Sequence, residues 1–156
     1  MESQLEEWLD IKWRPFLLKR VFGLEHLIQE WDLISMADTN IPSDAMASNA
    51  KRGLELRKKY GRGGTSVGVA RARDISNKKN LSNDTVLRMH SFFSRHEVDK
   101  KGKGFNSGEE GYPSNGLIAW LLWGGDSGQS WAESKRNKIM RERESEKIWK
   151  NSSFEL

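Results

Sequence analysis

Hydrophobic residues recur at intervals of three and four along most of the chain, which is the period of an amphipathic α-helix. The first such stretch covers residues 1–35 and is divided by Pro15. Residues 36–44 are small and polar and predict a linker. The helical period then resumes after Ser43, a good helix cap, and continues to Tyr60, where the glycines of GRGG predict the end of the helix.

Four further helices are predicted downstream of this glycine sequence. A short one follows Thr65, and a second begins near Ser82 with an apolar stripe that ends in two phenylalanines. Residues 99–115 are rich in glycine and predict a long loop, after which come an almost wholly apolar helix and a charged one. No segment alternates polar and apolar residues as a half-buried strand does.

These patterns predict an all-α fold, a compact multi-helix domain with a helix-turn-helix-like pair and a long glycine-rich loop. The expected layout is an N-terminal helical extension (1–35), a linker (36–44), a helical domain with a basic centre (45–150) and a short tail (151–156).

The composition narrows the class of protein. A chain of 156 residues can bury a core without disulfides or metal, and the absence of cysteine excludes thiol chemistry and fits a reducing compartment. The N-terminus is acidic, unlike a secretory signal, and no apolar run approaches the roughly 20 residues that cross a bilayer. We therefore expect a cytoplasmic protein that does not enter membranes.

Positive charge is concentrated in the middle of the chain. Residues 51–104 carry 15 basic and 5 acidic side chains, a net charge of +10, whereas residues 1–50 carry 4 and 9 and residues 105–156 carry 7 and 8. A basic surface of this kind attracts polyanions whatever fold lies beneath it, so nucleic acid is the first candidate partner.

The segment from Thr65 to His96 has the outline of a helix-turn-helix. Its second helix would place Asn83, Thr85 and Arg88 near the end that enters a major groove, where they could contact bases or phosphates. Arg71 and Arg73 on the first helix would add phosphate contacts. The alternative is two packed helices with a solvated basic face.

A second basic cluster surrounds the sequence GRGG and consists of Arg52, Arg57, Lys58, Lys59 and Arg62. Backbone N–H groups of the glycines could complete a phosphate site at the start of the next helix. No lysine followed by serine or threonine comes after the last glycine, which excludes a Walker A loop. The alternative is that these cations only complement the dipole at the end of their helix.

Gly125-Asp126-Ser127-Gly128 matches the letters that surround the nucleophile of trypsin-like serine proteases. We reject that interpretation, because the chain offers no β scaffold for the triad and Gln129 follows where a further glycine is required. The expected role is structural: Gly124 and Gly125 end a buried helix, and Asp126 or Ser127 caps the next one.

The three histidines do not form a metal motif, so we assign no metal, cofactor or catalytic residue. His96 and Asp99 cluster at a helix end, which we interpret as a capped and paired terminus. An enzyme, in the form of a nuclease that uses these two residues, ranks behind the binding functions.

Three stretches together, RGLELRKKYGRGGTSVGVARARDI, RHEVDK and YPSNGLIAWLLWGGDSGQSWA, resemble an uncharacterised domain of tailed-bacteriophage and prophage proteins. The resemblance covers about residues 45–135 and implies a phage origin, without an activity or a catalytic residue. It leaves the first 35 residues outside the recognisable part.

We therefore expect a phage accessory protein that binds nucleic acid, DNA first, through its basic helices in the host cytoplasm. The alternative is a structural component of the virion or of head assembly, whose partner is a phage structural protein.

Overall fold

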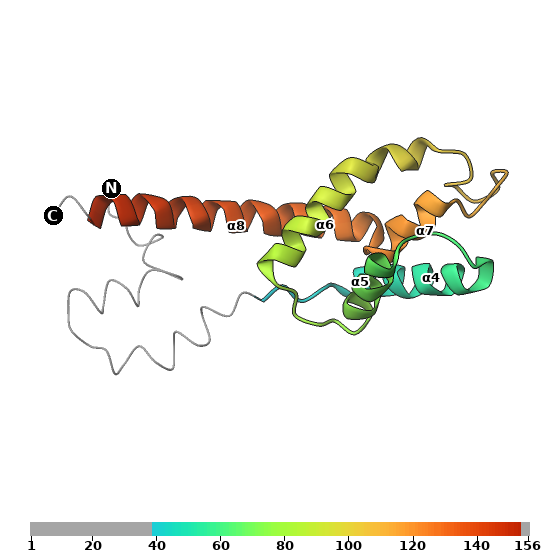
Figure 1. Ribbon diagram of the computed structural model, residues 1–156, viewed down its shortest axis with the longest axis horizontal. Helices are drawn as coiled ribbons and strands as arrows, with labels where there is room; N and C mark the ends of the chain where they lie inside the picture. Colours follow the sequence, from blue (N-terminus) through green and yellow to red (C-terminus); the bar gives the residue numbers. More distant parts are fainter. Residues whose placement is uncertain (1–38, 154–156) are drawn as a thin grey trace. The chain divides into compact units, whose positions relative to one another are not determined.

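The computed structural model describes residues 39–153, so the predicted helical extension of residues 1–35 lies outside the described part. The described residues from Asn40 onward belong to one compact unit, whose boundary between Thr39 and Asn40 falls within the expected linker. The described residues contain helices and connecting segments but no strand, which confirms the predicted all-α fold (Figure 1). The elements, labelled as in Figure 1, are α4 (Asp44–Tyr60), α5 (Ser66–Ser76), α6 (Asn83–His96), the 3₁₀ helix η1 (Glu97–Lys101), α7 (Asn115–Leu122) and α8 (Gly125–Ser153). Because α8 continues to Ser153, the first residues of the expected tail are helical.

Three helices begin where the sequence predicted a capping side chain. The hydroxyl oxygens of Ser43, Thr65 and Ser82 each accept a hydrogen bond from a backbone N–H three residues further on, at 3.3, 3.2 and 3.2 Å. Each bond satisfies an N–H that has no acceptor inside its helix. At its other end α4 stops at Gly61, whose φ of 64° is the left-handed conformation that glycine adopts without steric cost.

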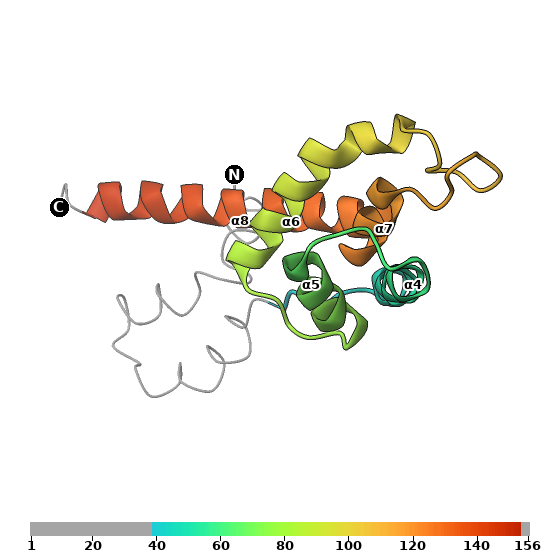
Figure 2. The ribbon, with the colours of Figure 1, turned by 45° about the vertical axis from the view of Figure 1, so that its right-hand side comes forward.

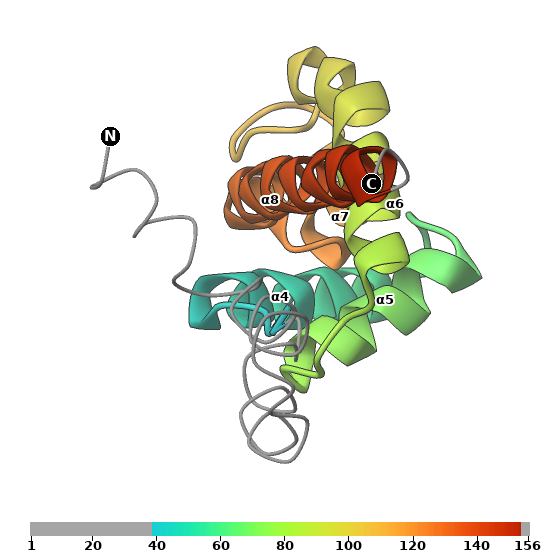
Figure 3. The ribbon, with the colours of Figure 1, turned by 90° about the vertical axis from the view of Figure 1, so that its left-hand side faces the viewer.

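The helices pack in two groups, which are joined by α7 and by direct contacts between α4 and α8. α5 packs on α4 and α7, whereas α6 packs mainly on α8 (Figure 2). Figure 3 looks nearly along α8 and shows α6 beside this helix and α4 beneath it. The two helices of the predicted helix-turn-helix-like pair, α5 and α6, follow each other in the chain, but each packs mainly on other helices and they do not form a packed pair.

Helices α4 and α7 approach each other closely at Gly53 of α4. A Cβ atom on this glycine would lie 2.8 Å from the backbone nitrogen of Leu122, so α4 and α7 meet backbone to backbone at this point. The core continues from there as an aromatic cluster that joins α6 to α7. The Phe92 and Trp123 rings are stacked 4.6 Å apart, and the Phe93 and Trp120 rings meet edge to face at 4.8 Å.

The corner between α7 and α8 differs in detail from the sequence prediction. Gly124 and Gly125 have positive φ values of 110° and 66°, as expected for glycines that end a helix, but α8 already begins at Gly125. The predicted cap at Asp126 or Ser127 is wrong, because both residues lie inside α8. One carboxylate oxygen of Asp126 accepts hydrogen bonds from the Trp120 indole N–H at 2.9 Å and the Lys100 ammonium at 2.8 Å. Asp126 therefore ties α8 to α7 and η1.

The predicted long loop is present between η1 and α7, with η1 taking up its first residues. The Glu109 carboxylate organises it, because it accepts hydrogen bonds from the backbone N–H of Gly104 at 2.9 Å and from the Asn106 side chain at 2.9 Å. The bonds from Asn106 are the main reason that the pKa of Glu109 lies below its usual value. The Ser114 N–H donates to the Gly104 carbonyl and closes the loop at the start of α7.

Candidate nucleic-acid interface

Five of the predicted contact residues gather at one end of the fold, which we call the basic end: Arg52, Arg57, Lys58, Lys59 and Arg62. They lie on the second half of α4 and on the glycine loop after it. Hydrogen bonds from Arg52 to Tyr112 and from Arg62 to Asn115 place the loop before α7, and the start of α7, at the same end (Figure 1).

The three arginines of the basic end are held by neutral acceptors. Arg52 donates to the Tyr112 hydroxyl at 2.8 Å, Arg57 to the Gly63 carbonyl at 3.0 Å, and Arg62 to the Asn115 amide oxygen at 2.9 Å. None of the ion pairs among residues 39–153 involves a cation of the basic end. The guanidinium groups are therefore positioned without being neutralised, and most of their N–H donors remain for an external acceptor.

An aromatic side chain lies among these cations. The Lys59 ammonium and the Arg62 guanidinium are 5.4 and 5.7 Å from the centre of the Tyr60 ring. Tyr60 is 41% exposed, which is unusual for a large aromatic side chain and leaves part of the ring available for stacking. Sequence analysis did not select Tyr60, although its place inside a basic run was visible.

The predicted contacts on α5 divide into one exposed and one paired arginine. Arg73 is exposed, as a phosphate contact requires. Arg71 instead forms an ion pair with Asp74 at 3.3 Å, its side chain is only 16% exposed, and its guanidinium lies 5.9 Å from the Trp123 ring. Its Nε–H is buried without an acceptor. Arg71 is therefore committed to internal contacts.

The start of α6, proposed above as the base-reading end of a recognition helix, is largely engaged within the fold. The Asn83 amide oxygen accepts a hydrogen bond from Asn40 at 2.8 Å, and the Thr85 hydroxyl accepts one from Ser82 at 3.0 Å. Arg88 is exposed. Asn83 and His96 lie at opposite ends of α6, about 20 Å apart along the helix axis at 1.5 Å per residue. The predicted contacts at the start of α6 are therefore far from the residues at its C-terminal end.

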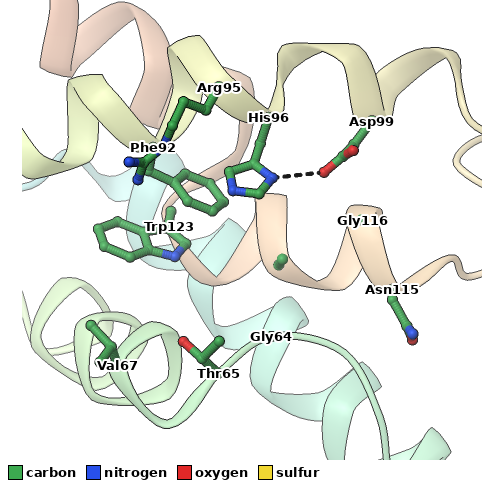
Figure 4. A pocket seen from close by; sticks show the side chains of 11 residues that line it. Gly64, Thr65, Val67, Phe92, Arg95, His96, Asp99, Asn115, Gly116 and Trp123 are labelled. Carbon is green, nitrogen blue, oxygen red and sulfur yellow. Dashed lines mark hydrogen bonds and ion pairs between the residues drawn. The ribbon is translucent and has the colours of Figure 1, made fainter.

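A cleft of about 460 Å³ lies between the start of α5, the end of α6, η1 and the start of α7 (Figure 4). Its residues include Thr65, Val67, Phe92, Arg95, His96, Asp99, Asn115 and Trp123. The cleft adjoins the basic end, because Asn115 at its edge is the acceptor for Arg62.

A column of three stacked rings forms one side of the cleft. Trp123 stacks on Phe92, and Phe92 stacks on His96 with ring centres 4.6 Å apart. His96 Nδ1 lies 3.0 Å from a carboxylate oxygen of Asp99 (Figure 4). The carboxylate accepts a hydrogen bond from the Nδ1–H group, which fixes the tautomer and leaves the Nε2 atom for a ligand or for solvent. Sequence analysis noted the pair of residues but not the aromatic column that holds the imidazole.

The Trp123 indole lies against the first turn of α5. Trp123 is 9% exposed, and its N–H donates to no acceptor among the described residues, while Figure 4 shows the nitrogen on the side of Thr65. A Cβ atom on Gly68 would lie 3.3 Å from this nitrogen. The close approach accounts for a glycine inside α5 that would otherwise only weaken the helix.

The motif around Ser127 belongs to the corner and not to the cleft. Asp126, its charged residue, holds the buried indole of Trp120. The hydrogen bond from Lys100, with that from Trp120, keeps the pKa of Asp126 below its usual value, although partial burial opposes the shift. The bond to Lys100 also fixes the end of η1, and therefore the segment that carries Asp99.

Within residues 39–153, no group of three or more histidine, aspartate or glutamate side chains is arranged to hold a metal ion. None of the described helices combines the length and apolar character needed to span a bilayer. No family model, curated protein or solved structure matches the chain.

Proposed function

We propose that this chain is a phage-encoded accessory protein that binds nucleic acid through the basic end, in the host cytoplasm. One observation carries the proposal: Arg52, Arg57 and Arg62 are positioned by neutral acceptors, so that their charges are fixed in place and not cancelled. Fixed cations bind phosphate with less loss of side-chain freedom than mobile ones. Lys58 and Lys59 add exposed charge beside them.

The expected mode of binding is recognition of the backbone, with little reading of base edges. Asn83 and Thr85, the side chains suited to base edges, use their oxygens inside the fold. The exposed ring of Tyr60 between two cations favours single strands, whose bases are free to stack on an aromatic surface.

The test is equilibrium binding to labelled duplex DNA, single-stranded DNA and RNA of the same length over a range of salt concentrations. We expect binding to all three, with the single strands preferred, and a steep loss of affinity as salt rises because bound cations release counterions from the phosphates. No binding at low salt, or an affinity that does not change with salt, would contradict the proposal.

The second candidate is a virion or head-assembly component, and one observation on α8 favours it. Beyond Ile139 no described residue of α8 is buried, and the apolar side chains of Met140 and Ile148 are 42% and 61% exposed. A helix with apolar residues beyond the core is suited to binding a partner helix. This candidate predicts the chain in purified particles at a fixed stoichiometry, together with no nucleic-acid affinity of the isolated protein.

A further inference from the structure

Hydrogen-bond donors without acceptors converge on the cleft. Trp123 as a residue is nine-tenths buried, and its indole N–H, which faces the cleft, donates to no acceptor among the described residues. The indole N–H faces the first turn of α5. The backbone N–H groups of Ser66 and Val67 in this turn have no acceptor inside the helix. The start of α7 borders the same cleft at Asn115. The first turn of α7 already lies against the Asp99 side chain, so the donors left for an anionic acceptor are the N-terminus of α5 and the Trp123 indole N–H.

The charged side chains around the cleft have the same preference. Arg95 lines it and is exposed, and Arg62 reaches its edge through Asn115. The acidic side chain in the lining is Asp99, whose carboxylate faces His96 Nδ1. With Nδ1 paired to Asp99, the Nε2 atom of His96 is an acceptor and suits a hydroxyl group of the ligand.

The remaining walls are apolar, so the ligand needs an apolar part as well as an anionic one. Phe92, Val67, Ala119 and the Trp123 ring provide these walls. A volume of about 460 Å³ lies within the range of about 300–1,000 Å³ typical of small-molecule sites. A planar base joined through its sugar to a phosphate has both parts in one unit of this size.

We propose that the cleft binds one phosphorylated nucleotide, with its phosphate at the donors of α5 and Trp123, its base or sugar against the apolar walls, and a sugar hydroxyl at His96 Nε2. The inference rests on the proposed nucleic-acid function and makes it more specific. The nucleotide can be the phosphorylated end of a strand or a free nucleoside monophosphate, since the chemistry is the same. An interior nucleotide of a duplex does not qualify, because its base is paired and stacked.

The test compares single-stranded oligonucleotides that are identical except for a 5′-phosphate, a 3′-phosphate or hydroxyl groups at both ends. We expect one phosphorylated end to raise the affinity about tenfold, the order of one hydrogen-bonded charged group. A nucleoside monophosphate is added as competitor. If the monophosphate displaces the phosphorylated strand, the cleft also binds free nucleotides. If it does not, the cleft binds only the phosphorylated ends of strands. Both results are consistent with a nucleotide site in the cleft.

The decisive variant is Asn115→Asp. Asn115 is exposed at the first position of α7, where a carboxylate is favourable for the helix and still accepts the Arg62 hydrogen bond. It places a negative charge at the edge of the cleft and beside Arg62, so both strands should lose affinity, and the advantage of the phosphorylated end should disappear on top of this shared loss. Asn137→Asp is the matched control, because Asn137 is an exposed asparagine on α8 whose amide oxygen also accepts from an arginine, Arg136.

His96→Asn provides a second variant, since its amide can still donate to Asp99 but lacks an atom at the position of Nε2. It should lower the preference for a phosphorylated end without changing the melting temperature by more than a few degrees. Equal binding of phosphorylated and hydroxyl-ended strands by the unmodified protein overturns the cleft proposal and leaves the proposed function standing. Absence of binding to every strand overturns both.

Discussion

Asp126→Ala should destabilise the fold clearly, although the side chain of Asp126 is 72% exposed. The reason is its partner Trp120, which is 2% exposed and whose indole N–H donates to Asp126 at 2.9 Å. Removal of the carboxylate leaves this N–H buried without an acceptor, at a cost of about 1–3 kcal/mol. Loss of the exposed ion pair with Lys100 adds about 0.2–1 kcal/mol. We therefore expect a loss of about 2–3 kcal/mol in the free energy of unfolding.

Urea unfolding followed by far-ultraviolet circular dichroism measures this loss. Ser127→Ala is the matched control, because Ser127 is the next residue in the first turn of α8, and it should cost less than about 0.5 kcal/mol. Asp126→Asn keeps an acceptor oxygen for Trp120 and removes only the charge, so it should cost less than about 1 kcal/mol.

A double-mutant cycle isolates the buried hydrogen bond. In a Trp120→Phe background the indole donor is absent, and Asp126→Ala should then cost less than about 1 kcal/mol. If Asp126→Ala costs as much in that background as in the unmodified protein, or no more than Ser127→Ala, the assignment of Asp126 as the anchor of the corner is wrong.

Three further results are expected. The pKa of Asp126 is lowered in the folded protein, so the charged carboxylate stabilises the fold above its unfolded pKa of about 3.9, and this stabilisation is lost as the pH falls through the lower folded value. The difference in urea midpoint between the unmodified protein and Asp126→Asn should therefore shrink below about pH 4. A difference that stays constant down to pH 2 would contradict this expectation. Gly53→Ala should destabilise the protein by about 1–2 kcal/mol, because overpacking against the Leu122 backbone exceeds the gain in helix propensity; a stabilised variant in thermal melting would show that α4 and α7 are not in backbone contact. Glu109→Ala should speed hydrogen exchange at the Gly104 and Asn106 amides and leave exchange in α6 unchanged, whereas unchanged exchange in the loop would show that Glu109 does not organise it.

Local signals in the sequence predicted the helices well, and the reason is physical. Ser43, Thr65 and Ser82 cap the helices that follow them, since a hydroxyl at this position satisfies N–H groups only three residues away. The glycines of GRGG and of the α7–α8 corner likewise mark turns that need positive φ. Such interactions depend on neighbours in the chain and are visible without a tertiary structure.

The candidate site could be predicted only in part, because its properties depend on contacts between distant residues. Charge alone indicated the basic end, but the acceptors of Arg52 and Arg62 lie 60 and 53 residues away in sequence. Contacts formed only in the folded chain also include the ion pair of Arg71, the hydrogen bond between Asn83 and Asn40, and the stacking of His96 on Phe92 and of Phe92 on Trp123. The sequence alone did not predict them. In the Gly125–Gly128 motif, the local expectation of a cap at Asp126 gave way to a bond with Trp120 on the preceding helix.

The most direct test of the central claim is the salt dependence of nucleic-acid binding by a double variant of the basic end. Lys58→Ala with Lys59→Ala removes two exposed cations, and Lys138→Ala with Lys147→Ala removes two exposed cations of α8 as a control of equal charge. If the basic end contacts phosphates, the slope of log affinity against log salt should become shallower by about 2 units for duplex DNA in the first variant and stay nearly unchanged in the second. Equal changes in both variants, or none in either, would contradict the claim that the basic end binds nucleic acid.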